Sequence, residues 1–163
     1  MLEEYSKIIE RATRRKKEIR KNLRDLKKQR RINLDELFGE EHRKAFEEID
    51  CLKCANCCAS LGPRITDRDI DRLARAARMK PGQLTETWLT IDEDGDYVYR
   101  EMPCPFLGAD KYCLYYEARP DACRRYPYTD RRNVKGYLGE LIKDMEICPA
   151  VALVLERVTG VNG

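Results

Sequence analysis

Cys51-Leu-Lys-Cys54-Ala-Asn-Cys57-Cys58, residues 51–58, is the stretch around which this sequence is organised. Two-residue spacers let the backbone fold around a metal ion or cluster, so that successive thiolates converge on it. A zinc knuckle uses one such pair and usually a second pair elsewhere, and no further C-x-x-C follows downstream. Ferredoxin-type clusters instead combine C-x-x-C-x-x-C with a remote cysteine that precedes proline. The spacing therefore favours iron and sulfide, with zinc as the alternative.

Two downstream cysteines, Cys104 and Cys148, precede proline and fit that remote ligand. If the backbone at Cys57 and Cys58 is extended, their side chains point to opposite sides, so one cluster can hardly bind both. We predict one or two iron-sulfur clusters of the 4Fe-4S type, with all eight cysteines as metal ligands. The first centre takes Cys51, Cys54, Cys57 and Cys148, whereas Cys58, Cys104, Cys113 and Cys123 form a second centre or remain as small buried side chains.

Length and composition set the context for these thiols. A chain of 163 residues suffices for one domain that buries about 70% of its extended surface. No run of about 18 apolar residues is present and the first residues do not resemble a secretory signal, so we expect a cytoplasmic protein with no membrane span. In a reducing compartment, metal-bound thiolates are favoured over the alternative, a disulfide framework.

Charge divides the chain. Residues 1–31 carry 13 lysines and arginines against five acidic residues, a formal charge of +8, which leaves −5 for residues 32–163. Apolar residues recur at spacings of three and four from Leu2 to Leu26, which predicts one amphipathic helix over about residues 2–31. Its apolar strip either docks on the domain or pairs with a second copy as a homodimer. Its basic face is either solvated or binds nucleic acid or an acidic protein partner.

Residues 32–49 predict a short helical connector that begins after Asn33 and is broken near Gly39. The only histidine, His42, lies in this connector and is expected at the surface rather than at the metal. We therefore divide the chain into a basic helix at 1–31, a connector at 32–49 and a cysteine-cluster domain at 50–160.

The rest of the sequence predicts a scaffold. Thr66 and Asp69 form a capping box ahead of a helix that ends before Pro81. A second helix holds Leu84, Trp88 and Leu89, a strand spans 97–99, and a hairpin joins 104–107 to 113–116. Short helices start at Pro120 and Pro149, the latter ending at Gly160. The fold class is α+β: a small, mostly helical, metal-nucleated domain with a short hairpin, preceded by a long basic helix.

The metal centre requires compensating charge. Four thiolates around a divalent ion or a cluster of charge +2 leave −2, which an interior of low dielectric must offset. Arg119 and Arg124 are the predicted cofactor-binding residues, and Lys53 and Arg125 are also near cysteines in sequence. Several tyrosines are expected to pack as a shell around the centre, the alternative being a tyrosyl catalyst: Tyr112, Tyr115, Tyr116, Tyr126 and Tyr128.

The order of these motifs resembles a known family. The stretches 51–58, 104–107, 112–116, 119–120 and 123–127 are similar to those of the CxxCxxCC cysteine-cluster proteins, also called YkgJ-like, over about residues 50–150. The resemblance implies a cysteine-bound zinc, iron or iron-sulfur centre. Where that family often has glycine, this chain has Ala55, so a left-handed turn there would have to come from Asn56. The flagellin lysine N-methylases are distantly similar and imply methyl transfer, although no glycine-rich nucleotide loop is present.

Two classes of function remain open at this point. The first is a metal-binding, iron-sulfur accessory or redox protein that works with an unknown protein partner. The second is an iron-sulfur-dependent enzyme, such as a protein methyltransferase, with a cluster iron that lacks a protein thiolate. A structural-zinc scaffold that binds a partner or nucleic acid is a further alternative. The sequence identifies no catalytic residue.

Overall fold

The computed structural model describes residues 1–161. It comprises two compact units, which we describe separately. Unit 1 contains residues 1–54 and the chain from residue 127 onward, and unit 2 contains residues 55–126. Residues 1–31 and 32–49 share unit 1 with the C-terminal helix, whereas the division into functional domains stays a prediction.

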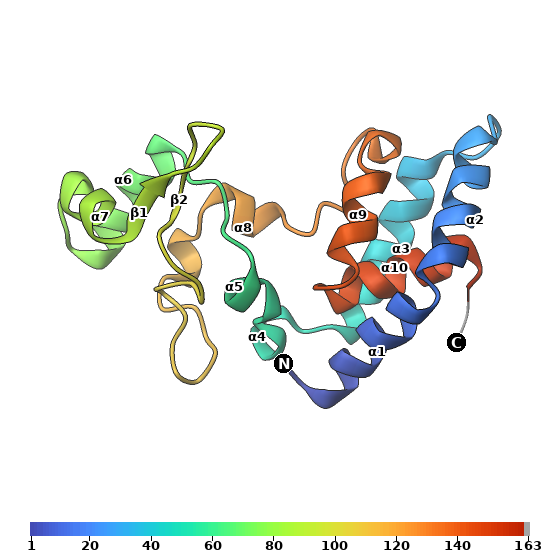
Figure 1. Cartoon of the computed structure of the whole chain (residues 1–163), viewed down its shortest axis with the longest axis horizontal. Helices are drawn as coiled ribbons and strands as arrows, with labels where there is room; N and C mark the ends of the chain where they lie inside the picture. The colour runs from blue at the N-terminus through green and yellow to red at the C-terminus, as the bar shows by residue number, and fades with distance from the viewer. Residues whose placement is uncertain (162–163) are drawn as a thin grey trace. The chain divides into compact units, whose positions relative to one another are not determined.

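Unit 1 is a helical bundle built around its last helix (Figure 1). Helix α10 packs against α1, α2, α3 and α9. All its residues except Arg157 are buried, and its first seven residues, Pro149 to Leu155, are all apolar, as expected of a helix inside a bundle. The elements of unit 1 are α1 (Glu3–Arg14), α2 (Lys16–Lys28), α3 (Leu34–Glu48), α4 (Cys51–Cys54), η2 (Val134–Gly136), α9 (Leu138–Asp144) and α10 (Pro149–Thr159).

Polar contacts fix the N-terminal helices on α10. The Arg11 guanidinium donates two hydrogen bonds, of 2.8 and 2.6 Å, to the carboxylate of Glu156, which is 3% exposed. The Asn22 amide donates to the Thr159 carbonyl at 3.0 Å. The apolar strip of the first helices therefore docks within its own unit. A homodimer through this strip stays a prediction.

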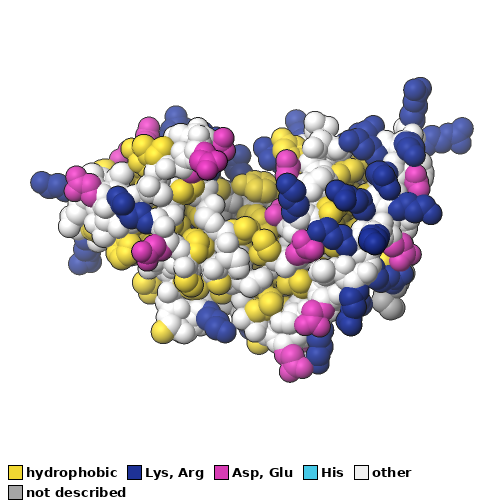
Figure 2. Space-filling model, in the orientation of Figure 1, with side chains coloured by type: hydrophobic (Ala, Val, Ile, Leu, Met, Phe, Trp, Pro, Cys, Tyr) yellow, Lys and Arg dark blue, Asp and Glu magenta, His cyan; other side chains and the backbone are white. Residues whose placement is uncertain are grey.

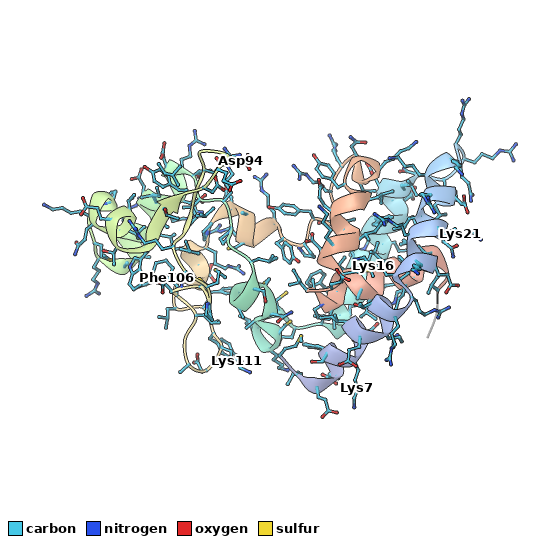
Figure 3. All side chains as sticks on the ribbon, viewed as in Figure 1. Lys7, Lys16, Lys21, Asp94, Phe106 and Lys111 are labelled. Carbon is cyan, nitrogen blue, oxygen red and sulfur yellow. The ribbon has the colours of Figure 1, made fainter. Side chains whose placement is uncertain are left out.

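The N-terminal segment is two helices, which corrects the prediction of one continuous helix. The break lies at Arg15, whose φ of −97° and ψ of 11° depart from helical values. The next residue, Lys16, which Figure 3 labels, falls on the apolar seam. Its ammonium group forms an ion pair with Glu146 at 2.8 Å. A charged side chain on a buried strip needs such a partner. Lysine and arginine side chains gather over this region in Figure 2.

The connector helix also differs from its prediction. α3 begins after Asn33, as expected, with the Asn33 side chain accepting the Glu36 amide at 3.3 Å. It then continues through Gly39 without a break, because Leu34, Phe38 and Ala45 are buried along its face. Packing against α10 outweighs the low helix propensity of one glycine.

Unit 2 is a small α+β fold, which confirms the predicted fold class (Figure 1). Strands β1 and β2 pair antiparallel with Leu89 opposite Tyr99, and a strand at 89–91 was not predicted. The capping box of α6 is present as predicted, with Thr66 and Asp69 bonded reciprocally. The elements are α5 (Asn56–Ser60), α6 (Asp67–Ala77), α7 (Pro81–Trp88), β1 (Leu89–Ile91), β2 (Tyr97–Tyr99), η1 (Tyr116–Ala118) and α8 (Asp121–Arg125).

The core of unit 2 centres on Phe106, which is labelled in Figure 3. The rings of Trp88, Tyr99 and Tyr115 pack edge-on against it, with centroid distances of 6.0, 5.7 and 5.0 Å. The hairpin predicted at 104–116 forms only one bridge, between Leu107 and Cys113, so the hairpin of this fold is the one at 89–99. This aromatic core positions the loop that carries Cys104 and Cys113.

Candidate metal centre

Four cysteines from separate segments of unit 2 come together. We call Cys58, Cys104, Cys113 and Cys123 the four-thiol group. Their charges interact, because ionised Cys58, Cys104 and Cys113 each raise the pKa of Cys123. The sequence predicts the same four residues as a second centre, and their role as metal ligands stays a prediction. α5, the 104–113 loop and α8 each supply part of this group.

Backbone hydrogen bonds hold these segments together. The Cys104 amide donates to the Cys58 carbonyl at 2.8 Å, which ties the loop to α5. Within the loop, the Leu114 amide donates to the Phe106 carbonyl at 2.9 Å. The loop is thus fixed at both of its cysteines, by α5 on one side and by the Phe106 core on the other.

Three half-buried thiols in this group, Cys104, Cys113 and Cys123, resist ionisation. Burial raises the pKa of Cys104 to about 11, although a hydrogen bond from the Phe106 amide to its sulfur lowers this pKa. Burial and the neighbouring thiolates raise the pKa of Cys123 to about 12, and burial raises that of Cys113. A metal that binds here must displace protons from these thiols, because only thiolates are strong ligands.

Cys58 is the exception. The pKa of Cys58 is lowered to about 7, mainly by a hydrogen bond with the Cys57 thiol. Burial raises this pKa, whereas the positive charge of Arg119 lowers it further. The two sulfur atoms lie 4.0 Å apart, because α5 makes this stretch helical and the extended backbone considered for it does not form. The left-handed turn expected at Asn56 is made by Ala55 itself, with φ 53° and ψ 11°. Cys57 therefore lies beside the four-thiol group. Its assignment to the first centre stays a prediction.

Arg119 provides positive charge close to the sulfurs, since it lowers the pKa of Cys58, Cys113 and Cys123. Its guanidinium lies 3.4 Å from the centre of the Tyr116 ring, and its Nε donates to the Tyr116 carbonyl at 2.6 Å. These contacts hold the cation in place. The position agrees with the charge compensation expected from the sequence, while a direct role in binding a cofactor stays a prediction.

Arg124 has a different environment. Its guanidinium donates to the backbone carbonyls of Glu117 and Arg119, the latter at 3.1 Å. These bonds brace the turn between η1 and α8. Its cofactor-binding role stays a prediction. Lys53 pairs with Asp50 at 3.7 Å, and Arg125 is exposed.

The carboxylate of Asp69 also stabilises the turn between η1 and α8. The sequence predicted Asp69 only as part of a helix cap. Asp69 is 1% exposed and accepts hydrogen bonds from the Thr66 amide and hydroxyl and from the Asp121 amide. Arg72 donates to Asp69 and also to the Arg119 carbonyl, at 2.7 Å. Asp69 and Arg72 thus join α6 to the segment that carries Arg119 and Cys123. The capping pattern was the only sequence signal for Asp69.

Three further cysteines group within unit 1. We call Cys51, Cys54 and Cys148 the three-thiol group. Burial raises the pKa of Cys148 to about 12, the amides of Val151 and Ala150 lower it by bonding to the sulfur, and the charges of Cys51 and Cys54 raise it again. Cys148 is the N-cap of α10, and Cys51 is exposed. These are three of the four residues expected for the first centre.

The tyrosines only partly match the predicted shell. Tyr115 packs on the Phe106 core, whereas Tyr112 is 47% exposed and is not part of such a shell. Tyr99, which the prediction missed, is buried and bonded to the Cys104 thiol, and burial raises its pKa. His42 is partly buried rather than at the surface, with Nδ1 2.7 Å from the Thr129 hydroxyl.

The donor set fits zinc or iron. Thiolate is a ligand that both metals accept. Within residues 1–161, no three His, Cys, Asp or Glu side chains already stand in the arrangement of a metal-ion site. Zinc-sulfur bonds of about 2.3 Å require the sulfurs to move together on binding. None of the eight cysteines, all of which lie among the described residues, forms a disulfide in this structure.

The model of the CxxCxxCC family, described as "Putative zinc- or iron-chelating domain", matches residues 50–149. The chain belongs to this family. The matched stretch contains all eight cysteines, and the family description supports binding of zinc or iron by this part of the chain. Comparisons with curated proteins and with solved structures found no match. Among residues 1–161, no helix has both the length and the apolar character needed to cross a membrane.

Proposed function

We propose that this protein is an iron-sulfur protein with an accessory or redox role, and that the four-thiol group of unit 2 holds its metal centre. The observation that carries the proposal is the gathering of Cys58, Cys104, Cys113 and Cys123 from three segments, with the Arg119 cation beside them. Such a set offers four thiolates and partial compensation of their charge.

Each residue in this group has a distinct task. The thiolates of the four cysteines would bind the metal, and the amides of Phe106 and Tyr115 would donate to two of the bound sulfurs. Tyr99 donates to Cys104 and, with Phe106, shields that sulfur from water. An iron-sulfur cluster held here would supply one-electron transfer, whereas zinc would supply stability alone.

The test is the metal content of the full chain purified without oxygen. We expect a brown protein that contains iron and acid-labile sulfide, with Mössbauer spectra typical of an iron-sulfur cluster. A colourless protein with stoichiometric zinc would exclude the redox role and leave the structural-zinc alternative.

Site-directed variants locate the metal. Cys123→Ser removes one sulfur of the four-thiol group and should lower the iron content, while Leu114→Ser serves as the matched control. Leu114 is 65% exposed and lies next to Cys113. Equal iron in wild type and Cys123→Ser would refute the assignment.

An enzymatic role is the alternative function. It requires a cluster iron without a protein thiolate and an accessible pocket beside it. The number of thiolates at each centre therefore separates the two functions.

A further inference from the structure

Helix α2 has an apolar side that packs within unit 1 and a charged side that faces solvent. On the apolar side, Ile19 and Leu23 are 0% and 2% exposed, and the helix contacts α10 and α9. Figure 3 labels Lys21 on the charged side. We use the name basic face for the six exposed cations of this helix: Lys17, Arg20, Lys21, Arg24, Lys27 and Lys28.

Four cations of the basic face form a row along the helix. They follow one another at spacings of four, three and four residues: Lys17, Lys21, Arg24 and Lys28. Residues at these spacings lie on one side of a helix. At a rise of 1.5 Å per residue, the row is about 17 Å long. The basic face therefore presents its charge along a line, as a linear polyanion does.

Most of this charge has no acidic partner. Residues 14–31 contain eleven lysines and arginines against two acidic residues, a formal charge of +9. Both acidic residues are already in ion pairs, Glu18 with Arg15 and Asp25 with Lys28, each at 3.2 Å. Within the described part of the chain, the other five cations of the basic face are in no ion pair. A polyanion that binds here breaks no existing contact of these five side chains.

The surroundings of the basic face favour a nucleic acid over other acidic partners. The cores of protein interfaces are depleted of charged residues and enriched in aromatic ones, whereas residues 6–37 contain no aromatic residue. A helix that binds a membrane inserts its apolar side into the lipid, and the apolar side of α2 is buried within unit 1. Charge without an apolar anchor is typical of contacts to phosphates.

The same composition favours a duplex over a single strand. Proteins that bind single strands stack the unpaired bases on aromatic side chains, which this segment lacks. The bases of a duplex are already stacked, so only its phosphates need partners. The one amide side chain of α2 that is suited to reading a base, Asn22, donates to the Thr159 carbonyl instead.

We propose that the basic face of α2 binds the phosphate backbone of a nucleic-acid duplex without regard to base sequence. The lysines contact phosphates as point charges, and the arginines donate paired hydrogen bonds to phosphate oxygens. This inference goes beyond the proposed function and does not depend on a metal, because α2 contains no cysteine.

The test measures fluorescence anisotropy of short labelled duplexes, one of RNA and one of DNA, with the full chain purified without oxygen. Each phosphate contact contributes a slope of about −0.9 to the logarithm of affinity against the logarithm of salt concentration. Four contacts from the row therefore predict a slope of about −4. Binding of either duplex supports the proposal, and the tighter one identifies the source of the phosphates.

Variants locate the contacts. The triple variant Lys17→Gln, Lys21→Gln and Arg24→Gln should make the slope shallower by about 3. Glutamine is a good helix former, and unchanged helical circular dichroism verifies the fold. The matched control removes the same charge from exposed positions on other elements and should leave the slope unchanged: Lys80→Gln, Arg132→Gln and Lys135→Gln.

A gain of affinity provides a test that misfolding cannot imitate. Asp25→Asn removes the acidic partner of Lys28, which then becomes available to a phosphate. We expect this variant to bind the duplexes more tightly than wild type, with a slope steeper by about 0.9. Unchanged or weaker binding would count against the row as the contact surface.

Four other results would overturn the proposal. The first is no binding of either duplex at low salt. The second is an equal loss in the control and in the triple variant, which would make net charge the cause. The third is tighter binding of a poly-glutamate peptide or of phosphatidylserine vesicles, which would make the partner an acidic protein or a membrane. The fourth is a single strand that binds as tightly as the duplex.

Discussion

Replacing Asp69 with asparagine should destabilise unit 2 more than any surface substitution on the same helix. One carboxylate oxygen accepts the Thr66 amide and hydroxyl, and the other accepts Arg72 and the Asp121 amide. Asparagine has one acceptor oxygen, so two of these partly buried donors would face its NH₂ group. At about 1.5–3 kcal/mol for each bond to a charged group, we expect a loss of about 3–5 kcal/mol in the free energy of unfolding.

Trp88 makes this loss measurable. It is the only tryptophan of the chain and packs against Phe106 in unit 2. Its fluorescence during urea unfolding therefore reports on this unit. Asp71→Asn is the matched control, since Asp71 is exposed on the same helix, and it should change the unfolding free energy by less than about 0.5 kcal/mol. A loss below about 1 kcal/mol in Asp69→Asn would refute the reasoning.

The same carboxylate predicts a pH dependence. Burial raises the pKa of Asp69, but hydrogen bonds from Thr66, Asp121 and Arg72 outweigh this and leave the pKa lowered. The folded state then binds fewer protons than the unfolded state, so this contribution is present above an unfolded pKa of about 4 and is lost as the pH falls through the lower folded value. The stability difference between wild type and Asp69→Asn should accordingly shrink below about pH 4.

Four further predictions concern the backbone and the basic surface. Gly39→Ala should stabilise unit 1 by about 0.5–1 kcal/mol in thermal unfolding followed by circular dichroism, since a Cβ at this helical position meets no atom within 4 Å. Gly160→Ala, where φ is +66°, should have the opposite effect. Ala55→Gly should stabilise the chain by relieving a left-handed alanine, by about 1 kcal/mol, whereas the control Ala59→Gly should not. A labelled RNA oligonucleotide should bind wild type at low salt and lose affinity steeply as the salt concentration rises. It should bind more weakly to a variant in which Lys17, Arg20 and Lys21 are replaced by serine. No binding at low salt would contradict a nucleic-acid role for the basic face.

Local patterns in the sequence determined much of this fold. The Thr66 capping box, the strand after Gly95 and the helix from Pro149 to Gly160 are all present. Each of these features depends on residues only a few positions apart. Caps, turns and periodic apolar residues act over such distances, so the sequence reveals them directly.

Tertiary packing decided what local patterns left open. α3 continues through Gly39 because its face is buried against α10, and the N-terminal helix breaks beside Lys16, which pairs with Glu146. The grouping of the thiols is also a tertiary result, since Cys51 and Cys148 are almost 100 positions apart in the chain. Spacing shows that cysteines are suited to bind metal, but only the folded chain brings distant thiols together, because their proximity depends on which helices pack.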